Sequence, residues 1–407
     1  MKKFALHWQI LVALVLGVLY GLFFSEHTHY VTWLGDLFIR ALKMVIIPLI
    51  LSSIISGVTG IGNLENLGRL GFKTMFYYIA TSTLAILVGL FFVNLFAPGI
   101  GADLGFQQTV EGLDAANRSF GDTLLNIIPS NIFESFAKAD MLSIIFFAIF
   151  FGFFITQVES KYTTFLSDMF NAVFEVMMKI TLFIIKFTPL GIFGIVAGTI
   201  GEQAGESGAL LEIGGRLGMY SFTVLISLVF HSVITLPLIL KVFGKADPLK
   251  HLKAMTTPLL TAFSTSSSNA TLPLTMEAVE HNSGVSNKVT SFTLPLGATI
   301  NMDGTALYEC IAAIFIAQAY GMDLTIFQQF IVVVTALLAS IGAAGIPMAG
   351  LVMITVILSA IGLPLEGVGL ILAVDRPLDM CRTTVNVWSD SCGAAIIAKT
   401  EGEELKI

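Results

Sequence analysis

Charged and amide side chains recur at helical spacing near the C-terminal end of an otherwise apolar chain. The residues at steps of three or four are Asp379, Arg382, Asn386 and Asp390. In a helix, this spacing turns all of them roughly one way. A guanidinium is a planar fork that binds both oxygens of a carboxylate, and a carboxylate suits an ammonium. Arg382 and Asp379 together therefore predict a ligand that carries both groups, an acidic amino acid.

Two segments supply oxygen atoms that a hard alkali cation would accept. Asn301 and Asp303 lie in the first segment, and Asn386 and Asp390 lie in the second. Carboxylate, carbonyl and amide oxygens are the ligands that hard cations prefer. A lone asparagine in a membrane span more often bonds a neighbouring helix, and Asn386 alone fits that interpretation. With three polar neighbours in phase, a cation site is favoured.

The rest of the chain is too apolar for a water-soluble protein. Of its 407 residues, 55% are apolar and only 12% are charged, against about 25% charged residues in soluble proteins. The mean hydropathy is +0.87, so lipid must be the solvent for much of the surface. A net charge of −7 without a long basic run gives nucleic-acid binding no support. The three cysteines predict neither a disulfide framework nor a zinc site.

Ionisable residues inside such a chain need a partner or a function, because inserting one costs about 2.5–3.5 kcal/mol. The C-terminal third holds Asp303, Glu309, Asp379, Arg382 and Asp390. They could pair only with one another, since Arg382 and Asp379 are three residues apart on one helical face. One arginine cannot neutralise four carboxylates, however, so we expect cations to enter from outside.

Charge-free stretches near the ~20 residues of a spanning helix predict the first membrane spans. Six precede the polar segments: Phe4–Ser25, Met44–Leu64, Thr74–Ala102, Met141–Val158, Phe187–Gly201 and Leu217–Leu240. Lysine and arginine gather in alternate turns, which puts Lys2, Arg69 and Lys241 on the cytoplasmic side. We therefore expect a multi-pass protein of the cell inner (plasma) membrane with both termini in the cytoplasm.

Two later charge-free segments do not fit an ordinary span. Ala254–Met276 contains ten serines and threonines, and Leu324–Leu365 is twice as long as one span, with Gly342 to Pro347 near its middle. Broken backbone at membrane depth is tolerated where it is buried or lines a cavity. Both segments therefore predict re-entrant hairpins, the first entering from the cytoplasm and the second from outside. Each precedes a polar helix, which predicts an inverted repeat with a midplane site; two unrelated polar interruptions are the alternative.

Four strings, in this order, resemble the dicarboxylate/amino acid:cation symporter family, which contains the glutamate transporters. They are AFSTSSSNATLP at 262–273, TLPLGATINMDGTALY at 293–308, ASIGAAGIPMAGL at 339–351 and LDMCRTTVNVWSD at 378–390. The resemblance covers essentially the whole chain. It implies an all-α membrane protein with eight transmembrane helices, two re-entrant helical hairpins and inverted repeats, assembled as a homotrimer.

The resemblance also implies a static scaffold and a mobile transport domain that moves like an elevator. The scaffold would comprise residues 1–70 and 102–205, and the transport domain residues 71–101 and 206–407. The chain would then be no enzyme but a secondary active symporter. It would take up glutamate or aspartate with sodium ions and a proton, and potassium counter-transport belongs to the same expectation.

The family's motifs further imply one substrate site and three sodium sites. Substrate contacts would be Ser266, Ser268, Thr305, Ile346, Gly350, Asp379, Arg382, Thr383 and Asn386. The first sodium site would use Gly297, Asn301, Asn386 and Asp390. The second would use, mostly through backbone carbonyls, Thr299, Met302, Ser340, Ile341 and Ala343. The third would use Tyr78, Thr81, Ser82, Asn301 and Asp303.

Some positions depart from the family or distinguish its branches. Ser266 stands where archaeal members carry a second arginine, and Met380 stands where animal glutamate carriers carry theirs. Asn269 replaces a serine that is common in animal members. Glu309 resembles the proton-carrying carboxylate of animal glutamate carriers, where purely sodium-driven archaeal members have glutamine. A buried, neutral and inert carboxylic acid is the alternative for Glu309.

The sum of the formal charges at the site gives one hypothesis for how substrate and ions are coupled. The residues Asp303, Asp379, Asp390 and Arg382 sum to −2. A bound glutamate, with Glu309 protonated, makes −3, which three sodium ions would neutralise. A potassium ion would reduce the charge of the empty site on its return. Each net charge that moves is biased by about 2.3 kcal/mol per 100 mV.

Other functions remain open at this point. A neutral amino acid or C4-dicarboxylate symporter is opposed by Arg382 and by Asp379, respectively. An intramembrane serine hydrolase that uses Ser267 or Ser268 would need a base, and the nearest histidines, at 251 and 281, fall near the cytoplasmic ends of the hairpin. An ion channel is a third possibility, since oxygen-lined sites can conduct.

Overall fold

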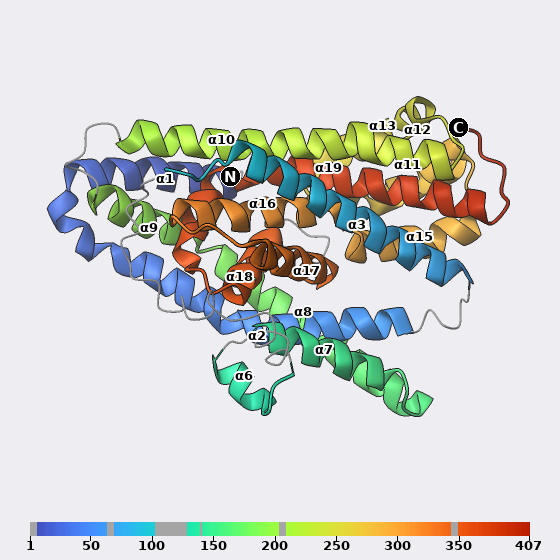
Figure 1. The fold of residues 1–407 in the computed structure, drawn as a ribbon, viewed down its shortest axis with the longest axis horizontal. Coiled ribbons are helices and arrows are strands. Elements are labelled where there is room, and N and C mark those ends of the chain that lie inside the picture. The colour runs from blue at the N-terminus through green and yellow to red at the C-terminus, as the bar shows by residue number, and fades with distance from the viewer. Residues whose placement is uncertain (1–5, 63–68, 102–127, 139–140, 203–208, 343–348) are drawn as a thin grey trace, which may run out of the picture.

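The computed structural model describes residues 6–62, 69–101, 128–138, 141–202, 209–342 and 349–407, and every regular element in these ranges is a helix (Figure 1). The first half contains α1 (Leu6–Phe23), η1 (Ser25–Tyr30), α2 (Thr32–Gly62), α3 (Arg69–Phe96), α6 (Ile132–Lys138), α7 (Met141–Ile155), α8 (Ser160–Ile185) and α9 (Thr188–Glu202). The second half begins with α10 (Ala209–Phe230), η3 (His231–Thr235), α11 (Leu236–Phe243), α12 (Pro248–Ala254), α13 (Thr256–Thr265), α14 (Ser268–Glu277) and η4 (Ala278–Ser283). It ends with α15 (Asn287–Ile300), α16 (Asp303–Ala319), α17 (Ile326–Gly342), α18 (Ala349–Ala360), η5 (Leu365–Gly367) and α19 (Val368–Thr400).

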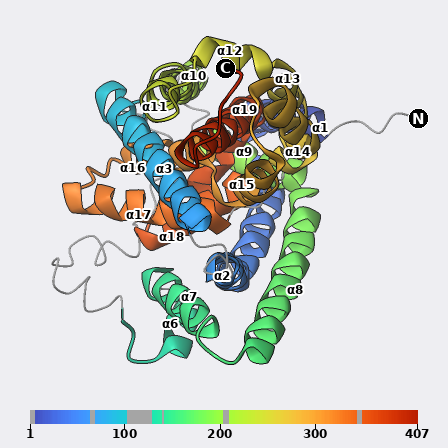
Figure 2. The same ribbon diagram turned by 90° about the vertical axis from the view of Figure 1, so that its right-hand side faces the viewer.

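The helices form two groups by their packing, and Figure 2 shows α2, α7 and α8 apart from α3, α10 and α19. In the first group, α2 packs against α7, α8 and α9, and α1 packs against α9. In the second group, α3 packs against α10, α16, α17 and α19, and α16 lies against α19 (Figure 1). Contacts of α2 with α17 and α18, and of α9 with α19, connect the two groups.

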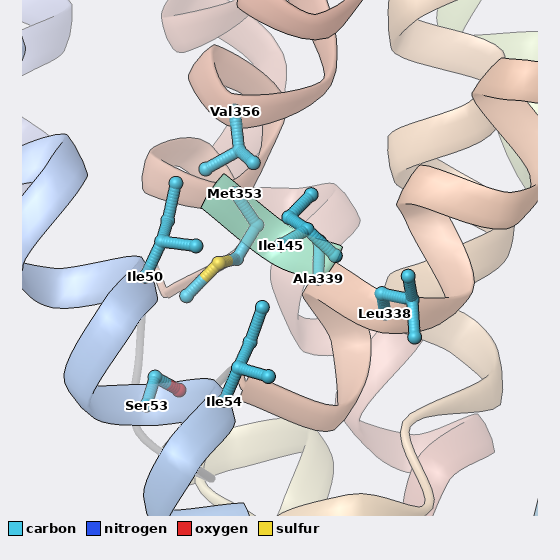
Figure 3. A pocket seen from close by; sticks show the side chains of 8 residues that line it. All are labelled: Ile50, Ser53, Ile54, Ile145, Leu338, Ala339, Met353 and Val356. Carbon is cyan, nitrogen blue, oxygen red and sulfur yellow. The ribbon is translucent and has the colours of Figure 1, made fainter. Parts of the chain in front are cut away.

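Where the first group meets the second predicted hairpin, the side chains around one cavity are almost all apolar. A small cavity there is lined by Ile50, Ser53, Ile54, Ile145, Leu338, Ala339, Met353 and Val356 (Figure 3). Only Ser53 has a polar side chain. Dispersion contacts between aliphatic groups are individually weak and non-directional, so this surface does not fix one register as a hydrogen-bonded surface would.

The first predicted hairpin is broken where its sequence is richest in serine. Helix α13 ends at Thr265, and Ser266 adopts the left-handed conformation with φ of 52°. Ser267 is extended and caps the start of α14, where its Oγ accepts a hydrogen bond from the Ala270 amide at 3.2 Å. A non-glycine residue at positive φ is uncommon, and here it reverses the chain between two short helices that pack against each other.

The second predicted hairpin consists of α17 and α18, which also pack against each other. The glycine-rich break expected between Gly342 and Pro347 falls mostly on residues 343–348, which lie outside the described residues. Helix α17 is described up to Gly342 and α18 from Ala349, so the break stays a prediction.

Two further irregularities lie in the second group. Asn301 and Met302 interrupt the chain between α15 and α16, with φ and ψ of −94° and 83° at Asn301. Both residues are buried. Between α10 and α11, the backbone widens into the π-helical turn η3, and Pro237 follows at the start of α11. Proline cannot donate a backbone hydrogen bond to the preceding turn, and π turns often mark functional sites.

The predicted span list needs one correction, at α8. This helix was not expected, because Lys161, Asp168, Glu175 and Lys179 removed its segment from the charge-free stretches. Glu175 and Lys179 form an i, i+4 ion pair at 3.1 Å, which suits an exposed helical face. Helix α8 joins the predicted span Phe187–Gly201 through a bend of 53° and together with α9 could form one span.

Three further helices in the described ranges are long and apolar enough to cross a membrane: Arg69–Phe96, Gly214–Phe243 and Asn287–Ala319. The count of eight spans therefore stays a prediction.

Candidate functional site

The polar residues meet where α19 passes the unwound backbone between α15 and α16. Two glycines allow this close approach. A Cβ at Gly304 would collide with the carbonyl oxygen of Arg382, and a Cβ at Gly297 would lie 2.5 Å from Asp390 Oδ1. Only glycine permits such contact between backbone and neighbour, so both motif glycines have a packing reason.

Arg382 is among the largest fully buried side chains, at 1% exposure. Its Nε donates to Asp379 Oδ1 at 2.9 Å, and its Nη1 lies 3.1 Å from Asp375 Oδ1. The guanidinium also stands 4.2 Å from the centre of the Tyr308 ring, a cation–π distance. Nη2 has no hydrogen-bond partner among the described residues. A buried donor without a partner is costly, so a ligand acceptor would complete this group.

Asp375 belongs to the site, although the sequence analysis did not select it. It is 1% exposed, and its Oδ1 accepts a hydrogen bond from the Tyr308 hydroxyl at 2.8 Å. It precedes Arg382 by seven residues, almost two helical turns, so both face one way. That spacing is the signal that could have identified it.

Asp379 is held between two arginines. Oδ1 accepts from Arg382, and Oδ2 lies 3.5 Å from Nη1 of Arg376, whose side chain is 30% exposed. The predicted Asp379–Arg382 pair is thus present. Arg376 was not predicted, although it precedes Asp379 by three residues in the same helix.

Asn386 connects α19 to the start of α16. Its Oδ1 accepts from the Gly304 amide at 2.8 Å, and its Nδ2 donates to Thr305 Oγ1 at 3.0 Å. The first amides of a helix lack partners within that helix, so Asn386 serves as a cap across the interface. Both ends of the amide therefore make the helix–helix contacts that a lone asparagine was expected to make.

Three of the four residues of the predicted first sodium site lie together. Asn301 Nδ2 donates to Asp390 Oδ1 at 2.8 Å, and Gly297 brings its backbone beside the same carboxylate. All three are buried. Asn386 lies one helical turn before Asp390 on α19.

The predicted third sodium site also forms one cluster, across α3. Thr81 Oγ1 donates to Asn301 Oδ1 at 3.3 Å, and Ser82 Oγ donates to Asp303 Oδ1 at 2.7 Å. Tyr78 donates to the carbonyl of Thr293 at 2.6 Å, within α15. This segment of α3 therefore places three hydroxyls at the broken helix.

Two residues of this cluster were missed by sequence reasoning. Nε2 of His231 lies 3.1 Å from Asp303 Oδ2, and Ser389 Oγ donates to the same oxygen at 2.6 Å. His231 is fully buried in the π turn η3. Its signal was a single histidine in the charge-free stretch Leu217–Leu240, since an ionisable residue in a span usually has a role.

The hairpin residues of the predicted substrate site are partly described. A Cβ at Gly350 would lie 3.1 Å from Arg382 Nη1, so the second hairpin approaches the guanidinium closely. Ser266 and Ser268 are buried at the break of the first hairpin, which packs against α19. Thr383 is buried on α19 beside Arg382. Ile346 lies outside the described residues.

The described residues leave the predicted second sodium site untested, although α15 and α17, which carry Thr299, Ser340 and Ile341, pack against each other. The Thr299 hydroxyl donates to the Leu296 carbonyl, and the Ser340 hydroxyl donates to the Leu337 carbonyl, each at 2.9 Å within its own helix. Met302 is in the unwound segment, Ile341 is in the last turn of α17, and Ala343 lies outside the described residues. This site stays a prediction.

Glu309 is fully buried on α16, and neither carboxylate oxygen has a hydrogen-bond partner among the described residues. A charge there would be unpaired in this part of the chain, which is costly in a low-dielectric environment. The arrangement fits a carboxyl group that carries a proton, and it equally fits the inert alternative.

The hydrolase alternative finds no support at the nearest histidine. His251 Nδ1 bonds Ser283 Oγ at 3.0 Å, and Nε2 bonds Ser391 Oγ at 3.1 Å. Both ring nitrogens of His251 are therefore occupied by serines other than the proposed nucleophiles, Ser267 and Ser268. A base must reach its nucleophile for this chemistry.

Comparison with known proteins agrees with this geometry. The profile of the sodium:dicarboxylate symporter family matches residues 6–400. The chain belongs to this family. The proton/glutamate-aspartate symporter of Escherichia coli (strain K12) is 35% identical, covering 98% of this chain and 93% of that protein.

Two further relatives of this symporter-family chain match along nearly its whole length. The proton/sodium-glutamate symport protein of Geobacillus stearothermophilus is 38% identical, covering 99% of this chain and 96% of its own. Excitatory amino acid transporter 3 of Homo sapiens is 36% identical, covering 98% and 87%. The resemblance seen in the four motifs is therefore confirmed, as is a helical membrane protein fold. Members of this family are transporters and not enzymes.

Proposed function

We propose that this chain is a secondary active symporter that takes up glutamate or aspartate with sodium ions and a proton. The observation that carries the proposal is the Arg382 guanidinium, buried at 1% exposure and with Nη2 free of hydrogen bonds to the described residues. A planar donor of this kind suits a carboxylate. The names of the bacterial relatives, which specify glutamate, protons and sodium, support the same function.

The substrate's side-chain carboxylate binds Arg382, and its ammonium binds Asp379. The α-carboxylate takes hydroxyl and amide donors at the break of the first hairpin, where Ser266 Oγ has no hydrogen-bond partner among the described residues. The remaining predicted contacts are Ser268, Thr305, Ile346, Gly350, Thr383 and Asn386. Asn386 acts mainly by fixing Thr305 and the start of α16 in place.

Sodium ions are co-substrates of this reaction. Asp390, Asn301 and the backbone near Gly297 hold one ion, and Asp303 with the α3 hydroxyls holds another. Both clusters join helices that are far apart in sequence, so an ion in either one stabilises the arrangement of α3, α15 and α19 that also forms the substrate site. The second predicted site, at Thr299, Met302, Ser340, Ile341 and Ala343, takes a further ion.

Glu309 carries the proton, and its unpartnered burial requires that it cross the membrane uncharged. After the substrate and its ions leave, the empty site has more carboxylates than arginines. A cation that binds there during the return step would reduce this negative charge, and potassium counter-transport would supply it. Substrate and coupling ions together bring the moving part close to neutrality, which lowers the cost of crossing the low-dielectric interior.

Alternating access follows from the two helix groups. Residues 1–70 and 102–205 form a scaffold, and residues 71–101 and 206–407 form the transport domain that moves like an elevator. The apolar contact in Figure 3 supports this division, because non-directional contacts let one surface slide along another. The protein is a homotrimer in the cell inner membrane, with both termini in the cytoplasm.

Uptake of labelled aspartate into proteoliposomes tests the function. Uptake should require sodium outside, respond to potassium inside, and accelerate when the outside is more acidic. Unlabelled glutamate should compete strongly, whereas serine and succinate, the neutral and amine-free analogues, should compete weakly. Full uptake without sodium would refute the coupling, and strong competition by succinate would favour a C4-dicarboxylate symporter.

Glu309→Gln isolates the proton. The variant should lose the pH dependence of uptake while it keeps sodium-dependent binding of aspartate, because glutamine retains the shape but holds no titratable proton. An unchanged pH profile would show that Glu309 is the inert acid.

A further inference from the structure

Arg376 is the cationic residue of the site that neither the motifs nor the proposed function uses. Its Nη1 lies 3.5 Å from Asp379 Oδ2, and its side chain is 30% exposed. Arg382 holds the other oxygen of the same carboxylate from the buried side. Asp379 therefore stands between one buried and one partly exposed guanidinium, at the position where the substrate's ammonium is expected.

We propose that Arg376 is the second arginine of the substrate site and determines its preference for acidic over neutral amino acids; this inference rests on the proposed function. The chain has neither of the two second arginines expected by resemblance, since serine and methionine stand at 266 and 380. Arg376 supplies that charge from one helical turn before Asp379 on α19. It is a specificity-determining residue that acts through charge and through the position of Asp379.

The balance of charge explains why a second arginine matters. Arg382 alone would share one positive charge between Asp375 and Asp379, and that trio would carry a net −1. Arg376 makes the four residues formally neutral. An acidic amino acid, which carries −1, then approaches a neutral site instead of a repulsive one, while a neutral amino acid gains much less.

The same pairing keeps Arg382 available for the substrate. Asp379 has two oxygens, and Arg376 occupies the one that Arg382 does not. Without Arg376, Asp379 would lose the guanidinium beside its Oδ2, and its charge would act on Arg382 and on the ammonium of the substrate. The carboxylate would draw more strongly on Arg382 and hold its donors away from the substrate's carboxylate.

The sum of formal charges at the site does not change when the two residues missed by sequence reasoning, Asp375 and Arg376, are included. Asp375 adds a negative charge and Arg376 adds a positive charge. Asp303, Asp375, Asp379 and Asp390 with Arg376 and Arg382 therefore sum to −2, as the shorter set did. The stoichiometry expected of the coupling ions is unchanged only if Arg376 belongs to the site.

The test measures the dissociation constants of L-aspartate and L-serine for the full-length purified protein in sodium. Arg376→Ala should weaken aspartate binding by about tenfold, the size expected when one nearby, partly solvated charge is removed. Serine binding should change by less than twofold, so the aspartate-to-serine preference collapses. Arg376→Lys, which keeps the charge, should recover most of the preference, and Arg376→Gln should behave like the alanine variant.

Ionic strength gives a second readout that a purely structural role would not move. Choline chloride added at constant sodium should narrow the difference between wild type and Arg376→Ala, because a partly exposed charge is screened. Arg40→Ala, which removes an exposed arginine of α2 away from the site, is the matched control and should leave both constants unchanged.

The outcomes separate this inference from the proposed function. If the wild-type protein binds no aspartate in sodium, the proposed function itself is wrong. If the wild type binds aspartate and Arg376→Ala keeps its constant within twofold, or weakens aspartate and serine equally, the inference about Arg376 is wrong. Should the alanine variant fail to fold, the comparison of Arg376→Lys with Arg376→Gln decides by the same criteria.

Discussion

The two helix groups differ in whether buried polar side chains join their helices, although in both groups many hydroxyls bond a carbonyl of their own helix. In the first group, the hydroxyls of Ser52 and Thr181 donate to carbonyls of their own helices, at Pro48 and Met177. In the second group, Ser82, Asn301 and Ser389 bond side chains of other helices.

This difference identifies the helices that polar contacts hold in one register. Hydrogen bonds inside one helix survive displacement of that helix, whereas bonds between helices hold the partners in register. The region around α3, α15, α16 and α19 is therefore fixed internally by polar contacts. The cavity between the first group and helices α17 and α18 is lined almost wholly by apolar side chains, which supports the proposed sliding (Figure 3).

The largest expected effect comes from removing the buried cation of the polar group. Arg382→Ala should weaken aspartate binding by at least about a hundredfold, since truncating one partner of a buried charge pair leaves the other uncompensated. Arg382→Lys keeps the charge but loses the planar fork, so it should bind with intermediate affinity. Calorimetric titration in sodium measures both, and an Arg382→Ala constant within tenfold of wild type would contradict the assignment.

The next largest effect is expected on the sodium dependence of aspartate binding. Asp303→Asn and Asp390→Asn should each raise the sodium concentration for half-maximal aspartate binding by about tenfold, because a carboxylate ligand loses its charge. Asp247→Asn is the control, since Asp247 caps α12 outside the site and asparagine caps equally well. A sodium requirement that stays unchanged in both site variants would show that these clusters bind no sodium.

Sequence reasoning located most of this polar region because helical spacing, and the free-energy cost of an ionisable residue in an apolar segment, can both be recognised from neighbouring residues. Asp379, Arg382 and Asp390 were visible as ionisable residues at helical intervals in an apolar chain. Asp375 obeys the same spacing and was overlooked, because the string that resembles the family begins at Leu378. His231 could be recognised only as a lone histidine, since its contact with Asp303 joins residues 72 positions apart.

The prediction of helices was limited in a similar way, since it used only the local pattern of charge and hydropathy. Charge-free length identified the apolar elements and both hairpins, but it failed at α8, whose charged face is satisfied by solvent and by an i, i+4 pair. The unwound turn at Asn301 and Met302 was also missed, because nothing in local hydropathy distinguishes a break that is stabilised by another helix.

A smaller effect is expected in the apolar contact. Ile54→Val removes one methylene beside the cavity of Figure 3, so it should lower the free energy of unfolding by about 0.5–1.5 kcal/mol. The aspartate constant should not change, because no polar contact of the site depends on this surface. Thermal unfolding in detergent and the binding titration measure the two quantities, and a shift in affinity larger than threefold would break the distinction between the groups.

The smallest effect is expected at the end of α19, where Glu401 bonds Lys73 at 2.6 Å and Arg69 at 2.9 Å. The hydrogen bonds from Lys73 and then Arg69 lower the pKa of this carboxyl below its ordinary value. Its stabilising contribution is thus complete above the ordinary carboxyl pKa and is lost as pH falls through the lowered folded-state value.

Glu401→Gln should accordingly lower the free energy of unfolding by about 1 kcal/mol or less at neutral pH, and it should not change it in strong acid. Unfolding curves of both proteins across acidic pH would reveal it. A difference in stability between wild type and Glu401→Gln that grows as pH falls would contradict this prediction.

In the proposed function, substrate and sodium jointly complete one set of buried charges. The most direct test is the L-aspartate dissociation constant of the wild-type protein, titrated across sodium concentrations at constant ionic strength. Because coupling between bound ligands is reciprocal, a logarithmic plot should fall with a slope approaching about three at low sodium. An aspartate constant that is independent of sodium would contradict the account.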